Sequence, residues 1–142
     1  MTGKRLERLV RLKRLAETAQ AAELESRRAS LAGARQQLDA VLARMDAADE
    51  ALEANSSAAD LAQAAGYRDH LSQEARTQTD EIVRRAQTVR EGEVDVQAAW
   101  RDRRLFEAVH ERATQREAAE EATRAHKDME AIALTRYGRG DS

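Results

Sequence analysis

A seven-residue repeat of large apolar side chains constrains this chain more than any other feature. Between residues 24 and 52, every seventh residue is Leu or Met. The repeat consists of Leu24, Leu31, Leu38, Met45 and Leu52. A repeat of this length keeps one stripe of a helix turned toward a partner helix over many turns. The pattern therefore predicts a supercoiled helix with these five residues in its seam.

The composition agrees with long helices and disfavours strand-rich folds. The 142 residues include no Pro, and 35% of them are charged. Thirty residues are Ala, so much of the apolar share is too small to fill a globular core. A chain rich in Ala, Glu, Arg and Leu is typical of coiled coils, and the lack of Pro removes the strongest helix breaker.

Leucines also recur near the N-terminus, but with a different spacing. Leu6, Leu9, Leu12 and Leu15 follow one another every three residues and lie out of phase with the later repeat. This difference predicts a change of register between Leu15 and Leu24.

A cluster of small polar residues at 54–59 interrupts the pattern. Ser57 and Asp60 resemble a helix-capping pair, because a hydroxyl and a carboxylate can meet the free N–H groups of a new helix. We expect one helix over about 3–54, a turn over about 55–66 and a second helix over about 67–137. A disordered tail is expected at 138–142.

The second helix carries a seam of its own. Its apolar positions are Leu71, Ala75, Ile82, Ala86, Val89, Val96, Trp100, Phe106 and Val109. If the chain turns back near residue 60, opposite residues have numbers that sum to about 120, which places large side chains opposite large ones. The expected fold is all-α: residues 1–142 form a single antiparallel coiled-coil hairpin, with Leu71, Ile82, Val89 and Val96 facing the first seam.

The second helix is longer than the first, so its C-terminal part is expected to overhang. Residues 117–137 carry an apolar stripe without a partner in the hairpin. The stripe consists of Ala118, Ala122, Ala125, Met129, Ile132 and Ala133. An uncovered apolar stripe predicts an external partner, although an Ala-rich, charged helix can also stand alone.

No catalytic or metal-binding motif emerges from the sequence. The chain has no Cys and no glycine-rich phosphate loop, and its three histidines are widely spaced. Glu107 and His110 match only half of a di-iron motif. A two-helix hairpin also offers no pocket in which to desolvate carboxylates. We expect no catalytic residue, no metal and no cofactor.

Charge is unevenly distributed, with a net charge of about +5 over residues 1–15 and about −5 over residues 36–66. No aromatic residues interleave the basic block, which disfavours nucleic acid as a partner. No apolar run is long enough to cross a membrane, and the N-terminus lacks the apolar core of a secretion signal. We expect a cytoplasmic protein that inserts into no membrane and docks to an acidic protein surface.

Both ends of the chain resemble the FliJ family of flagellar export proteins. The opening residues 5–15 repeat an Arg-Leu pair every three residues. The closing residues 124–136 match the family's C-terminal pattern, with His126 where Gln is usual. The matching C-terminal residues are Lys127, Asp128, Glu130, Ile132, Ala133 and Arg136.

The resemblance implies a non-enzymatic part of the flagellar type III protein export apparatus. FliJ-like proteins bind the hexameric export ATPase and the cytoplasmic domain of the export gate, and they resemble the central stalk of rotary ATPases. The implied location is the cytoplasmic base of the export apparatus. The implied ATPase-binding residues are Leu6, Leu9 and Leu12 together with the six C-terminal residues above. Export chaperones are further implied partners. The alternative is a coiled-coil spacer or chaperone adaptor without effect on an ATPase.

Overall fold

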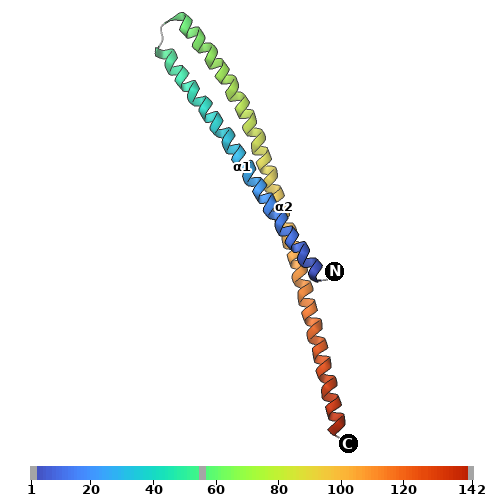
Figure 1. Cartoon of the computed structure of the whole chain (residues 1–142). Coiled ribbons are helices and arrows are strands. Elements are labelled where there is room, and N and C mark those ends of the chain that lie inside the picture. The colour runs from blue at the N-terminus through green and yellow to red at the C-terminus, as the bar shows by residue number, and fades with distance from the viewer. Residues whose placement is uncertain (1–2, 55–56, 141–142) are drawn as a thin grey trace. The chain divides into compact units, whose positions relative to one another are not determined.

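The computed structural model describes residues 3–54 and 57–140, which form two helices (Figure 1). Helix α1 spans Gly3–Ala54 and helix α2 spans Ala58–Gly140. The prediction of an all-helical chain with two long helices packed against each other is confirmed. Two compact units are distinguished: the hairpin unit, Thr18–Ala98, and the terminal unit, which combines Met1–Glu17 with Ala99–Ser142. Each unit is described separately.

The second helix begins earlier than the sequence predicts, and residues 55 and 56 of the expected turn lie outside the described residues. Helix α2 begins at Ala58, whereas the prediction placed its start near residue 67. The carbonyl oxygen of Ser57 accepts a hydrogen bond from the Leu61 amide at 3.0 Å, and its Oγ lies 3.5 Å from the Asp60 amide nitrogen. This cap starts the helix at once, and the Ala-rich residues that follow sustain it through Gly66.

The predicted disordered tail at 138–142 is also wrong in part. Helix α2 continues to Gly140, so residues 138–140 are helical. Residues 141 and 142 lie outside the described part of the chain. A helix can include glycine at a cost of about 1 kcal/mol relative to Ala, so Gly138 does not end α2.

Two apolar clusters join the helices within the hairpin unit. In the first, Leu24, Leu31 and Val89 are buried, with Ile82, Ala86 and Val96 packed against them. In the second, Val41, Ala48 and Leu71 are buried, with Met45 and Ala75 packed against them. Each cluster takes side chains from both helices, so burial of these apolar surfaces holds α1 against α2.

Most buried and half-buried positions on α1 follow one heptad frame, and the predicted register change is wrong. These positions alternate in steps of four and three residues along α1. The one described frame position that is exposed is Gln20, and the alternation continues on both sides of it. The frame comprises Leu6, Val10, Lys13, Glu17, Leu24, Arg27, Leu31, Ala34, Leu38, Val41, Met45, Ala48 and Leu52. The frame was hidden because Lys13 and Glu17 occupy seam positions, while Leu12 and Leu15 are 53% and 62% exposed.

Helix α2 keeps the same four–three spacing with polar members in its seam. The frame comprises Leu71, Ala75, Gln78, Ile82, Arg85, Val89, Gly92, Val96, Ala99, Arg103, Phe106, His110 and Ala113. Trp100 and Val109, which the sequence placed in the seam, are 48% and 42% exposed. They flank the seam because Ala99, Arg103 and His110 take the inward positions instead.

Contacts between the helices run antiparallel in each unit. In the hairpin unit, Arg68 pairs with Asp49, and in the terminal unit, Lys13 pairs with Asp102. The residue numbers of these pairs sum to 117 and 115, close to the predicted 120. Within the described residues, neither helix contains an apolar stretch long enough to span a membrane.

Candidate interaction surface

All nine seam residues expected from the sequence lie in the hairpin unit and away from open solvent. Four are buried: Leu24, Leu31, Leu71 and Val89. Five are half-buried: Leu38, Met45, Leu52, Ile82 and Val96. Because both helices contribute to this surface, these side chains serve the fold and are not available to a partner.

The three N-terminal residues of the expected ATPase site differ in exposure. Leu6 is only 4% exposed and Leu9 is half-buried, whereas Leu12 is 53% exposed. Leu6 lines a groove of about 430 Å³ together with Val109, Ala113 and two arginines, Arg112 and Arg116. Leu6 therefore already packs within the terminal unit, and Leu12 is the leucine that a partner could reach.

The C-terminal residues of the expected site are all exposed on α2. Every residue from 114 to 138 is exposed. The large apolar side chains here have exposed fractions between 58% and 79%, and they are Met129, Ile132, Leu134 and Tyr137. Leu134 and Tyr137 also line a shallow hollow with Glu130 and Ala133. Large exposed apolar side chains on one helical segment mark a surface for interaction.

The apolar stripe of this segment does not continue the seam that faces α1. That seam reaches Ala113, and its next positions would be Glu117 and Glu120. The stripe starts instead at Ala118 and continues through Ile132, alternately one and two residues beyond the positions that would continue the seam. An offset of one to two residues corresponds to about 100–200° around a helix. The stripe therefore faces a different direction from the seam on the same helix.

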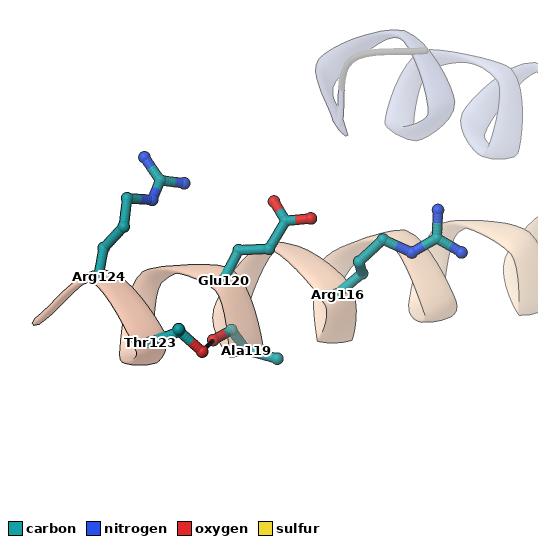
Figure 2. A pocket seen from close by; sticks show the side chains of 5 residues that line it. All are labelled: Arg116, Ala119, Glu120, Thr123 and Arg124. Carbon is teal, nitrogen blue, oxygen red and sulfur yellow. Dashed lines mark hydrogen bonds between the residues drawn. The ribbon is translucent and has the colours of Figure 1, made fainter. Parts of the chain in front are cut away.

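A charged groove lies beside the start of the stripe (Figure 2). It has a volume of about 420 Å³ and is lined by Arg116, Ala119, Glu120, Thr123 and Arg124. Figure 2 shows the side chains of Arg116, Glu120 and Arg124 on one side of the helix, with Thr123 on the other. The Thr123 hydroxyl donates to the Ala119 carbonyl at 2.9 Å, so it offers no free donor to a ligand.

An interhelical ion network holds the two helices of the terminal unit together. We use this name for Lys13, Arg14 and Glu17 of α1 with Asp102, Arg103 and Glu107 of α2. Lys13 Nζ lies 2.6 Å from Asp102 Oδ2, and Arg14 Nε lies 3.0 Å from Glu107 Oε1. Arg103 bridges the helices, since it pairs with Glu17 on α1 and donates to Glu107 on α2.

The network shifts the pKa values of two of its members. Hydrogen bonds from Arg14 and then Arg103 lower the pKa of Glu107, because both stabilise its carboxylate form. Hydrogen bonds to Glu17 and Glu107 raise the pKa of Arg103. Both shifts favour the charged forms of Glu107 and Arg103.

The sequence interpretation missed this network, although a signal for it was present. Extending the heptad frame of Leu24 backward reaches Glu17, Val10 and Leu6 in turn. The sequence analysis follows the three-residue spacing of the N-terminal leucines instead, which places neither Lys13 nor Glu17 in the seam. Their partners on α2 occupy or adjoin the opposite seam, which shows that the pattern continues with ion pairs in place of apolar contacts.

Net charge differs in sign between the two units. The terminal unit has fifteen Arg and Lys against eleven Asp and Glu, a net charge of +4. The hairpin unit has nine against fifteen, a net charge of −6. The exposed stripe belongs to the basic unit, but residues 117–137 themselves carry three Arg and Lys against five Asp and Glu, so the net basic charge of the unit lies outside the stripe segment.

Comparison with known proteins identifies the family. The family model described as flagellar FliJ protein matches residues 2–142. No curated protein and no solved structure matches the chain. Since the family match covers nearly the whole length, the chain belongs to the flagellar FliJ protein family and is a component of the type III protein export apparatus of the flagellum.

Proposed function

We propose that this chain is a stalk-like coiled coil that binds and stimulates the hexameric export ATPase and links it to the cytoplasmic domain of the export gate. Family membership supports the export system as its setting. The observation that carries the proposal is the exposed stripe Ala118–Ile132, which is out of frame with the seam facing α1. A stripe in its own heptad frame suits a partner other than α1.

In this account the segment 117–137 projects past α1 and enters the ATPase ring. Met129 and Ile132 provide apolar contact, and Lys127, Asp128 and Arg136 provide charged contact around them. Leu12 and the half-buried Leu9 contribute from α1, with Leu6 supporting them from beneath. Glu130 and Ala133 complete the surface.

A stalk acts on the ring by binding its subunits unequally. Two helices present different side chains to chemically identical subunits, so one conformation of the ring binds them better than another. A ligand shifts a conformational equilibrium only through such a difference in affinity. The stalk itself hydrolyses nothing and needs no metal or cofactor.

The proposed location is the cytoplasmic base of the export apparatus, where the ATPase and the export gate are neighbours. Export chaperones are further partners in this account. The remaining candidate function is a spacer or chaperone adaptor. A spacer or adaptor would bind its partners without changing the rate of ATP hydrolysis by the export ATPase, whereas a stalk would raise that rate.

Binding to the purified ATPase tests the stripe directly. The double variant Met129→Ser, Ile132→Ser removes its two largest side chains. A matched control is Val83→Ser, Val94→Ser, because these valines are 60% and 65% exposed on α2 within the hairpin unit. We expect the stripe variant to weaken binding about tenfold or more and the control to leave it within about twofold. Equal affinities for the two variants would exclude the stripe as the binding surface.

A further inference from the structure

Few apolar side chains attach residues 3–17 to α2, and none of those that the described part of α2 supplies is fully buried. Among the described residues of the terminal unit, the only buried hydrophobic side chains are Leu6 and Val10. Both apolar clusters belong to the hairpin unit. Since apolar burial is the main favourable term in folding, this part of α1 depends on other contacts.

The interhelical ion network supplies most of those contacts. Its paired side chains are between 20% and 63% exposed, so water and salt reach them. Lys13 also lies 5.1 Å from the ring centroid of Phe106, which is a cation–π contact. Exposed ion pairs are weak individually and become weaker as salt screens them.

The start of α1 is held by charge as well. Its first turn contains no acidic residue to complement the positive end of the helix, and Lys4 and Arg5 add positive charge there. A Cβ built on Gly3 would lie 3.5 Å from Glu117 Oε2, so α2 places a carboxylate beside this end. Attraction between that carboxylate and the helix dipole is likewise screened by salt.

We propose that residues 3–17 form a strap that detaches from α2 as ionic strength rises, while the hairpin unit stays folded. Detachment exposes the α2 seam from Ala99 to Ala113, including the half-buried Phe106. It also frees Leu6 and Val10 together with the basic residues between them. The proposal concerns the chain alone and does not rest on the proposed function.

Hydrogen exchange of the full chain at fixed pH, measured by mass spectrometry, tests the strap. We compare exchange in about 0.05 M and about 1 M NaCl, which changes the screening length severalfold. Amides of residues 7–17 are expected to exchange about tenfold faster at high salt, whereas those of residues 31–45 change less than about twofold. Exchange that is independent of salt in 7–17, whether fast or slow, overturns the proposal.

A pair of variants separates the network from general charge effects. Arg103→Gln removes the side chain that bridges Glu17 and Glu107. Arg101→Gln removes the same charge from an exposed position of α2 that forms no ion pair with any described residue. At low salt, the amides of residues 7–17 in Arg103→Gln should exchange nearly as fast as those of the wild type do at high salt. In Arg101→Gln, the same amides should exchange at the rate of the wild type at low salt. Wild-type exchange in Arg103→Gln overturns the proposal.

Discussion

Arg27 of α1 lies across Gly92 of α2, in contact with the backbone where a side chain would otherwise stand. A Cβ built on Gly92 would lie 3.3 Å from Arg27 Cδ and 3.1 Å from Leu24 Cδ1. The Arg27 guanidinium reaches over this position and donates to the Thr88 carbonyl oxygen at 3.0 Å. Because Gly92 has no side chain, Arg27 can reach the backbone of α2.

This contact predicts opposite outcomes for the same substitution at two helical glycines. Gly33 has no side-chain neighbour within 4 Å of a built Cβ, so Gly33→Ala should raise the free energy of unfolding by about 0.5–1 kcal/mol. Gly92→Ala gains the same helix propensity but crowds Leu24 and Arg27, and we expect no stabilisation or a loss. Urea unfolding measures both, and equal stabilisation by the two variants would show that the seam at Gly92 has room.

Leu71 anchors the second apolar cluster, where it is 1% exposed. Leu71→Ala should lower the free energy of unfolding by about 2–4 kcal/mol, because it removes buried methyl groups and leaves a cavity. Leu42→Ala is the control, since Leu42 is 44% exposed on α1 and should lose less than about 1 kcal/mol. Similar losses for both variants would contradict the assigned seam.

The ion network predicts a pH dependence through Glu107. Arg14 and Arg103 lower the pKa of this carboxyl group in the folded chain, and Glu17 shares Arg103 with it. A lowered folded-state pKa stabilises the fold above the pKa of an unfolded glutamate and ceases to do so as pH falls through the lowered value. The Tm of the wild type should therefore exceed that of Glu107→Gln at neutral pH, and the gap should close in acid.

Glu111→Gln serves as the control for this titration. Glu111 is exposed on the next turn of α2 and pairs with no described residue, so its substitution should leave Tm nearly unchanged at every pH. A gap between the wild type and Glu107→Gln that persists below pH 3 would show that the network stabilises the fold by something other than the Glu107 charge.

The apolar seam of the hairpin unit was predictable from the sequence, whereas Trp100 and Val109 were wrongly placed in the seam and its polar members were not predicted. Leu24 and Leu31 are buried where their seven-residue spacing places them. The spacing is informative because a helix that repeats every 3.5 residues must turn those side chains toward a partner. Glu17 lies in the frame that extends backward from Leu24, but that frame does not identify its partner, and the pairing with Arg103 is apparent only once α2 lies opposite.

The turn and the binding surface were harder to predict, for different physical reasons. Gly66 and the small residues near Ser57 fit either a long turn or a capped helix, and the cap at Ser57 decided the outcome. Leu12 and Ile132 are exposed, and an exposed side chain carries no local evidence of the partner that would cover it. Family membership supplies that context.

The most direct test of the stalk account is the rate of ATP hydrolysis by the export ATPase, with and without this chain. We compare the intact chain with one that ends after Gln115, which keeps the hairpin unit but lacks the stripe. Thermal unfolding of both chains controls for loss of the fold. The account predicts that the intact chain raises the rate severalfold and the shortened chain does not. An unchanged rate with the intact chain, at concentrations where the hexamer forms, would contradict it.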